Sequence, residues 1–131
     1  MNFEEYFEKI NAQKQIDTLA KKYKHKRVVV YGAGAMAKIL FKNYNLKKLN
    51  IVAVCDNKFS EKKEDFFGFK TLSPEELKAF NYDIILVLVQ KYSMIEKNLK
   101  YGLLFDSKNE NVKIEKFIKI PLLMLLKEIL F

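Results

Sequence analysis

Residues 28–37 have the sequence Val-Val-Val-Tyr-Gly-Ala-Gly-Ala-Met-Ala. A run of β-branched residues without a polar interruption is typical of a strand that is buried on both faces, as the strands of parallel sheets are. Two of the chain's four glycines, Gly32 and Gly34, end this run. Apolar residues then recur at helical spacing over residues 35–44. The stretch therefore predicts a buried strand, a tight glycine turn and a helix that begins directly after the turn.

The glycine turn has the form G-x-G-x-x-A, in which each small residue has a physical role in binding phosphate. Gly32 permits the tight turn that leaves the strand. Gly34 lacks a Cβ atom, so a pyrophosphate can approach the backbone N–H groups, and the helix dipole favours its charge. Ala37 is small enough for the helix to pack closely against the strand. The residues of this candidate phosphate site are Gly32, Ala33, Gly34, Ala35, Met36 and Ala37.

Polar residues also follow the next two predicted strands, at the same edge of the sheet. Asp56 lies 22 residues after the second glycine, where an acid accepts hydrogen bonds from the hydroxyls of an adenosine ribose. Asn57 and Lys58 extend this candidate site. A phosphorylated ribose is an alternative ligand group, because the positive charge of Lys58 could offset the charge of its phosphate. Gln90 follows the most apolar run, residues 83–89. The alternative is structural: the glycines only make a tight turn, and Asp56 caps a loop.

The rest of the chain alternates helical and strand patterns, which predicts a parallel sheet covered by helices on both faces. The predicted elements are helices at 1–25, 35–44, 93–100 and 122–131, a further helix that starts at residues 73–76, and strands at 27–31, 51–54, 83–89 and, at the sheet edge, 112–120. Ser73 is the expected N-cap of its helix, and Gly102 the expected C-terminal cap of the helix before it. We therefore predict an α/β fold, a three-layer Rossmann-like parallel sheet with an extra N-terminal helix and a short apolar C-terminal helix.

The length indicates a single domain over residues 1–131. It is expected to consist of the N-terminal helix at 1–25, a nucleotide-binding core at 26–105 and a C-terminal edge strand and helix at 106–131.

The composition limits the chemistry that the chain can perform. Cys55 is the only cysteine and His25 the only histidine, which excludes an internal disulfide and leaves no metal site or catalytic triad to predict. The formal net charge is +8, but Arg27 is the only arginine among 24 basic residues. Lysine lacks the bidentate fork with which arginine reads guanine and clamps phosphates, so we expect no specific nucleic-acid binding. No apolar run approaches the roughly 18 residues of a membrane span, and we expect a cytoplasmic protein.

Four segments carry a resemblance to a known group of proteins: residues 28–37, Val-Ala-Val-Cys-Asp-Asn at 52–57, Gly-Phe-Lys-Thr-Leu-Ser-Pro-Glu-Glu-Leu at 68–77 and Tyr-Asp-Ile-Ile-Leu at 82–86. Over residues 26–105 the chain resembles the small Rossmann-like domain of bacterial polysaccharide-biosynthesis proteins. These include nucleotide-sugar dehydratases and epimerases and the nucleotide-sugar-binding domain of sugar acetyltransferases, and related domains resemble CoA-binding domains. The resemblance implies a pocket for NAD, NADP or a nucleotide sugar at the carboxyl ends of the strands.

The catalytic part of those enzymes has no counterpart in this sequence. A Tyr-x-x-x-Lys pair occurs at Tyr44 and Lys48, but it follows the helix of the glycine turn, whereas in short-chain dehydrogenases it stands much later. We interpret it as coincidence. We expect a domain that binds a dinucleotide or nucleotide sugar in surface-polysaccharide or nucleotide-sugar metabolism, without complete catalytic machinery. The alternatives are a protein-interaction module that binds no ligand and a fragment of a SAM-dependent methyltransferase. The methyltransferase is less favoured, because its glycine loop usually has an acid two residues before the first glycine, where this chain has Val30.

The chain is also expected to associate with a partner enzyme or a second copy of itself. Residues 122–131 are apolar apart from Lys127 and Glu128, so a helix there would expose an apolar face. The segment is too short to cross a bilayer and therefore needs a protein groove. Two-fold dimers are the commonest outcome for such surfaces. The competing explanation is that residues 122–131 begin a larger domain.

Overall fold

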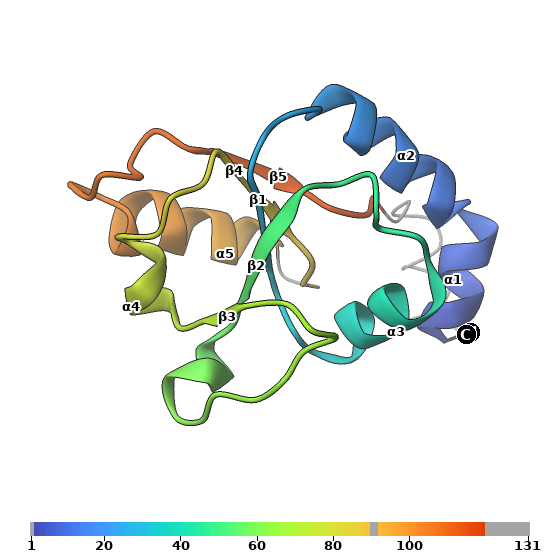
Figure 1. Ribbon diagram of the computed structural model, residues 1–131, viewed down its shortest axis with the longest axis horizontal. Helices are drawn as coiled ribbons and strands as arrows, with labels where there is room; N and C mark the ends of the chain where they lie inside the picture. The colour runs from blue at the N-terminus through green and yellow to red at the C-terminus, as the bar shows by residue number, and fades with distance from the viewer. Residues whose placement is uncertain (1, 90–91, 120–131) are drawn as a thin grey trace.

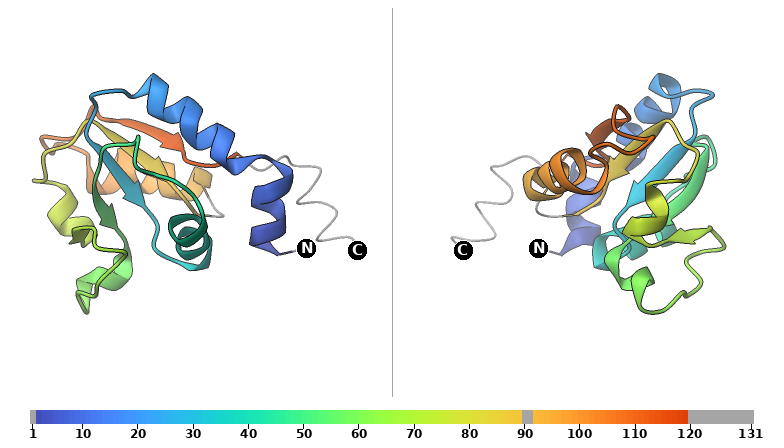
Figure 2. Two further views of the ribbon diagram at one scale, coloured as in Figure 1. Left: turned by 45° about the vertical axis from the view of Figure 1, so that its right-hand side comes forward. Right: turned by 90° about the vertical axis from the view of Figure 1, so that its left-hand side faces the viewer.

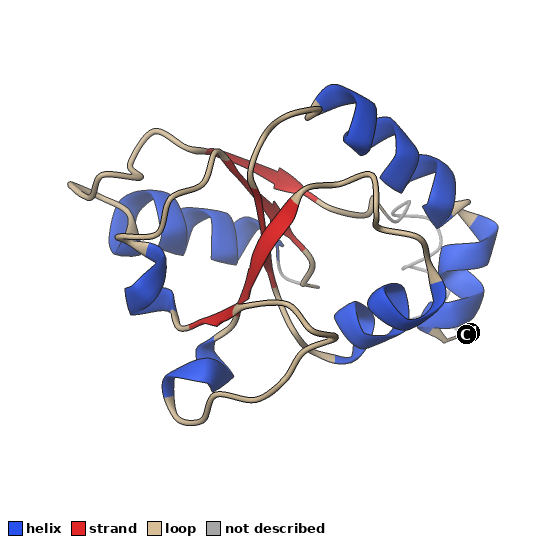
Figure 3. Ribbon diagram, viewed as in Figure 1, coloured by secondary structure: helices blue, strands red, loops and turns tan. Residues whose placement is uncertain are grey.

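The computed structural model describes residues 2–89 and 92–119. Over these residues the centre of the molecule is a five-stranded sheet in the order β3-β2-β1-β4-β5, in which every neighbouring pair is parallel (Figure 3). The strands are β1 (Val28–Tyr31), β2 (Ile51–Cys55), β3 (Thr71–Leu72), β4 (Ile84–Val87) and β5 (Lys113–Lys116). The strand order reverses between β1 and β4, as it does in doubly wound nucleotide-binding folds. The predicted Rossmann-like α/β fold is confirmed.

Helices cover both faces of this sheet (Figures 1 and 2). One face carries α1 (Phe3–Lys9), α2 (Ala12–Lys22) and α3 (Ala35–Asn43), and the other carries α4 (Pro74–Leu77), α5 (Tyr92–Asn98) and the π-helical segment η2 (Leu99–Leu103). The β1 side chains alternate between the two cores: Val28 and Val30 face the first, and Val29 and Tyr31 the second. All four are buried, which explains why this strand has no polar residue.

The N-terminal segment differs from the prediction. A single helix over residues 1–25 is wrong, because the chain breaks at Asn11 and forms α1 and α2. Asn11 has a left-handed backbone with φ 52°, and its side chain accepts a hydrogen bond from the N–H of Lys14. Asparagine tolerates this conformation and is a preferred N-cap, so the residue can end one helix and begin the next. The apolar stripe continues across the break, which is why periodicity did not reveal it.

The helix after β4 also ends differently from the prediction. Gly102 is not its C-terminal cap but lies inside η2, where the chain widens into a π-helical turn. The N–H of Leu104 donates to the carbonyl of Leu99 at 2.9 Å, five residues earlier. Among the described glycines, a positive φ occurs at Gly32 and Gly68 only.

The start of α4 confirms the sequence prediction in detail. The N–H of Glu76 donates to the Ser73 hydroxyl at 3.2 Å, and the N–H of Ser73 donates to the Glu76 carboxylate at 2.9 Å. This reciprocal arrangement is a capping box, with Pro74 in the first turn.

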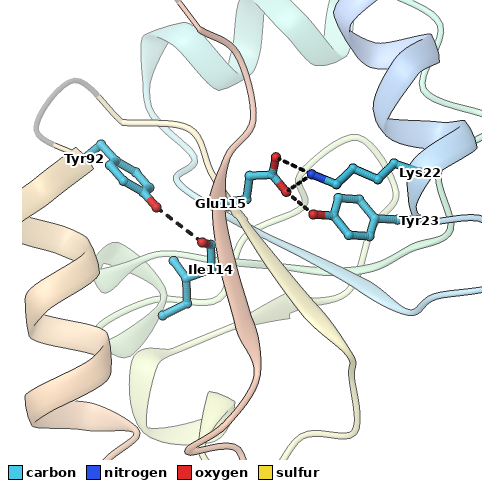
Figure 4. A network of polar contacts seen from close by, with 5 residues as sticks. All are labelled: Lys22, Tyr23, Tyr92, Ile114 and Glu115. Carbon is cyan, nitrogen blue, oxygen red and sulfur yellow. Dashed lines mark hydrogen bonds and ion pairs between the residues drawn. The ribbon is translucent and has the colours of Figure 1, made fainter.

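The edge strand β5 is fixed by side chains from both helical layers (Figure 4). From α2, Lys22 donates to the Glu115 carboxylate at 3.1 Å, and the neighbouring hydroxyl of Tyr23 donates to the same carboxylate. From α5, the Tyr92 hydroxyl donates to the carbonyl of Ile114 at 3.3 Å. The predicted edge strand is thus confirmed as a parallel strand. The helix predicted at 122–131 lies outside the described residues.

Among the described residues, no helix has both the length and the apolar character that a membrane crossing would need.

Candidate functional site

The candidate site lies at the carboxyl edge of β1, β2 and β4, where Gly32 leaves the first of these strands. The Gly32 N–H donates to the carbonyl of Cys55 at 2.8 Å and so continues the pairing of β1 with β2. Its φ is 125°, and a Cβ atom there would stand 2.4 Å from the carbonyl oxygen of Leu88. Both the backbone conformation and the close approach of β4 therefore require glycine at this position.

Gly34 has a different role, because it is the N-cap of α3 and faces solvent. A Cβ atom at Gly34 would meet no heavy atom within 4 Å. The residue offers no side chain to cap the helix, and no described residue accepts a hydrogen bond from the N–H groups of Ala35 or Met36. Within the described residues, the start of α3 thus has N–H groups without an acceptor and a positive dipole end, as an anion-binding helix start does.

Asp56 closes the glycine turn from the side of β2. Its Oδ2 atom accepts a hydrogen bond from the N–H of Ala33 at 2.8 Å, and its Oδ1 atom accepts one from the N–H of Lys58 at 3.0 Å. Asp56 is therefore the N-cap of the short helix η1 (Asn57–Ser60), the loop-capping role of the structural alternative. Each carboxylate oxygen has two lone pairs, so both can still accept a hydrogen bond from a ribose hydroxyl.

The Lys58 side chain folds back over the same turn. Its ammonium group donates to the carbonyl of Ala33 at 2.8 Å and forms an ion pair with Glu64 at 3.3 Å. It also lies 5.5 Å from the ring centre of Phe59 and 5.7 Å from that of Phe66. A positive charge is therefore held at the carbonyl of the residue that precedes the N-cap of α3.

The other predicted site residues divide by exposure. The side chains of Ala33, Met36 and Ala37 are buried in the core between α3 and the sheet, so these residues can contribute only backbone atoms to a ligand. Ala35 and Asn57 are exposed. Gln90 lies outside the described residues.

Sequence reasoning missed two residues at this site, Glu64 and Phe66. Residues 58–65 have no hydrophobic periodicity, and nothing in their order shows that the Glu64 side chain forms an ion pair with Lys58. Phe66 belongs to the aromatic turn before β3, in which the N–H of Phe69 donates to the Phe66 carbonyl at 3.0 Å. The aromatic-glycine pattern of this turn was a signal for its shape but not for its contact with the lysine.

Cys55 and Tyr31 lie beneath the site and take no part in it. Burial raises the pKa of the Cys55 thiol to about 12, and burial likewise raises the pKa of the Tyr31 hydroxyl to about 12. A thiol that stays protonated at neutral pH is not a nucleophile, so Cys55 is a packed core residue, as its apolar neighbours indicate. Tyr44, of the Tyr-x-x-x-Lys pair, lies at the opposite end of α3 from Gly34.

Two clefts lie on the outer side of α3, and the second includes Phe66, whose ring also contacts Lys58. One, of about 390 Å³, lies between α1 and α3 and is lined by Phe7, Ile39 and Tyr44 among others. The second, of about 400 Å³, lies next to it beside the exposed ring of Phe67. Neither is lined by the glycine turn or by Asp56. The candidate site is an open edge of the sheet, where a ligand would be held mainly by backbone donors and Lys58.

A family model described as C2185-like, N-terminal, matches residues 24–118, which is well over half of the chain. The chain belongs to the C2185-like, N-terminal family. The matched range of this C2185-like domain begins after α2 and contains all five strands, the glycine turn, Asp56 and Lys58. No curated protein and no solved structure matches the chain.

Proposed function

We propose that this C2185-like domain binds a nucleotide through its phosphate groups: NAD, NADP or a nucleotide sugar. The observation that carries the proposal is the start of α3, where Gly34 is exposed and no described residue accepts a hydrogen bond from the N–H groups of Ala35 or Met36. This helix start stands beside β1 and β4, where the strand order reverses. In open α/β sheets, ligands bind outside the carboxyl ends of the strands at such a point.

The described residues fit such a ligand in three ways. The N–H groups of Ala35 and Met36 would donate to a pyrophosphate, and the Lys58 ammonium would offset its charge. The Asp56 carboxylate would accept hydrogen bonds from a ribose diol while keeping those from Ala33 and Lys58. A bound NAD or NADP would supply a hydride acceptor or donor. The chain's own residues bind and orient the nucleotide.

The setting proposed for this binding is surface-polysaccharide or nucleotide-sugar metabolism in the cytoplasm, where such nucleotides are found. The domain would act there with a partner enzyme or as a homodimer, because the sequence has no counterpart to the catalytic part of the enzymes that it resembles. Its resemblance to domains of nucleotide-sugar enzymes supports this setting.

A second candidate is a protein-interaction module that keeps the fold without a nucleotide. The observation in its favour is that the polar groups of the edge already satisfy one another: Asp56 accepts from Ala33 and Lys58, and the Lys58 ammonium returns to Ala33. A turn closed on itself in this way needs no ligand for its stability.

Thermal unfolding in the presence of NAD(H), NADP(H), UDP-sugars and CoA separates the two candidates. A ligand at roughly 100 times its Kd stabilises the folded state by about 2.7 kcal/mol, a shift that is easily measured. The nucleotide proposal predicts stabilisation by at least one of these compounds, and its loss in Gly34→Val. No stabilisation by any of them would favour the interaction module.

A further inference from the structure

The ion pair between Lys58 and Glu64 joins two parts of the loop that follows β2. The Lys58 side chain is 33% exposed and the Glu64 side chain 50% exposed, with 3.3 Å between Nζ and Oε1. The ammonium keeps three further contacts without Glu64: the Ala33 carbonyl and the rings of Phe59 and Phe66. Its position over the glycine turn therefore does not depend on the ion pair.

Other charges near Lys58 are already engaged. Asp56 receives two backbone N–H groups, and the neighbouring Lys63 pairs with Glu76 and donates to the carbonyl of Thr71. Among the described residues, Glu64 is therefore the carboxylate that neutralises the Lys58 ammonium. It does so from an exposed loop position, where an ion pair is weak and screened by salt.

We propose that Glu64 is an internal competitor for the anionic ligand of the glycine turn. Its carboxylate pairs with the Lys58 ammonium in the free protein, and a phosphate or pyrophosphate group at the start of α3 would compete with it for that positive charge. Glu64 thereby lowers the affinity for phosphate-bearing ligands and leaves neutral ligands unaffected. This inference rests on the proposed nucleotide site and assigns a determinant of its affinity.

The physical basis is that both anions are attracted by the same ammonium group. A pyrophosphate carries more charge than one carboxylate and would also receive the N–H groups at the start of α3, so it can displace Glu64. Binding of the ligand loses the weak Lys58–Glu64 attraction. A variant without the Glu64 carboxylate has no such attraction to lose, so it should bind the ligand more tightly.

The test is a calorimetric titration with inorganic pyrophosphate at low ionic strength. The protein is the full chain, as wild type, Glu64→Gln, Lys58→Gln and the double variant. Glu61→Gln is the matched control, because Glu61 is an exposed acid of the same loop whose side chain forms no ion pair within the described residues. Glu64→Gln and Glu61→Gln change the net charge equally, so the difference between their pyrophosphate affinities isolates the contact of Glu64 with Lys58.

Glu64→Gln is expected to bind pyrophosphate about two- to five-fold more tightly than wild type, and Glu61→Gln to change the affinity little. The gain should shrink at about 0.15 M salt and vanish in the Lys58→Gln background. Equal changes of pyrophosphate affinity in Glu64→Gln and Glu61→Gln, or a gain of affinity that persists without Lys58, would overturn the inference. The proposed nucleotide site would stand in either case. If wild type and Gly34→Val bind pyrophosphate equally, or neither binds it, the proposed site fails and this inference fails with it.

Discussion

Gly32 and Gly34 stand two residues apart and are glycines for different reasons. At Gly32, β4 leaves no space for a side chain and φ is positive, so the fold itself requires the residue. At Gly34 the backbone is extended, with φ −87°, and nothing lies within 4 Å of a would-be Cβ. The fold does not need glycine at position 34, and the ligand proposed for this site would account for it.

Gly34→Val is therefore expected to abolish pyrophosphate and nucleotide binding and to change the free energy of unfolding by only about 1 kcal/mol or less. A side chain there would stand where the phosphate approaches the helix donors. Titration and urea unfolding measure the two effects. The control is Gly32→Ala, which should lose about 2 kcal/mol or more, because the new methyl group meets the Leu88 carbonyl at a positive φ. Unchanged nucleotide affinity in Gly34→Val would contradict the phosphate-binding assignment.

Asp56→Ala should affect both stability and ligand choice. Loss of the carboxylate leaves the buried N–H of Ala33 without its acceptor, which is expected to cost about 1–3 kcal/mol in the free energy of unfolding. If Asp56 also holds a ribose diol, the variant should lose more affinity for NAD than for NADP. Urea unfolding and paired titrations measure these effects, with Glu61→Ala, at an exposed acid of the same loop, as control. Lower stability with an unchanged NAD-to-NADP ratio would restrict Asp56 to the role of a cap.

At the scale of one element, the charge on Glu76 contributes to the start of α4. Hydrogen bonds from Lys63 and from the Ser73 backbone lower the pKa of Glu76 to about 2. A carboxyl group whose pKa is lowered by folding adds stability above its ordinary pKa, and that stability is lost as the pH falls toward the folded value.

We therefore expect wild type to be more stable than Glu76→Gln at about pH 5, and the difference to shrink at about pH 2.5. Glutamine keeps the oxygen that accepts from the Ser73 N–H, so the comparison isolates the charge. Urea unfolding at both pH values measures it. Glu75→Gln is the control, because Glu75 is 76% exposed and pairs only with Lys78 among the described residues. A difference that does not depend on pH would show that the charge of Glu76 contributes nothing.

The junction of α1 and α2 makes a second prediction at the scale of elements. Asn11→Ala loses the side-chain cap to Lys14 and places an alanine at φ 52°, so it should destabilise the fold by about 1–2 kcal/mol. Asn11→Gly also loses the cap, but glycine adopts the left-handed backbone without strain, so its loss in the free energy of unfolding should be smaller. Urea unfolding of the two variants ranks them. An equal or reversed order would show that the left-handed conformation is not the limiting feature.

For the whole molecule, the chain beyond β5 is held against the N-terminal helices. The side chain of Gln15 accepts from the N–H of Lys119 at 2.8 Å and donates to its carbonyl at 3.1 Å. This clamp places the last described residue beside α2.

The full chain is accordingly expected to form a dimer in solution, and a version that ends at Lys119 to be monomeric. The reason is that the sequence at 122–131 is apolar apart from Lys127 and Glu128, and such a segment would gain free energy if a second copy removed it from water. Light scattering on both proteins measures the association. Two monomers of the same, unaggregated behaviour would refute self-association through the termini.

The sequence by itself determined the features that depend on neighbouring residues. The strand, glycine turn and helix at residues 28–44 and the capping box at Ser73 follow from side-chain size, β-branching and short-range hydrogen bonds. Alternation of these elements was enough to predict a parallel sheet with helices on both faces. The break at Asn11 escaped prediction because one asparagine leaves the apolar stripe intact on both sides.

Only the tertiary structure decided what the polar residues of the candidate site touch. Spacing placed Asp56 and Lys58 at the carboxyl edge of the sheet, but it could not show that Asp56 bonds to Ala33 or that Glu64 pairs with Lys58. Tyr23 and Glu115 likewise meet only because β5 packs beside α2. Such contacts join residues that are distant in the chain, so they depend on how the layers pack, and local sequence preferences carry no information about that packing.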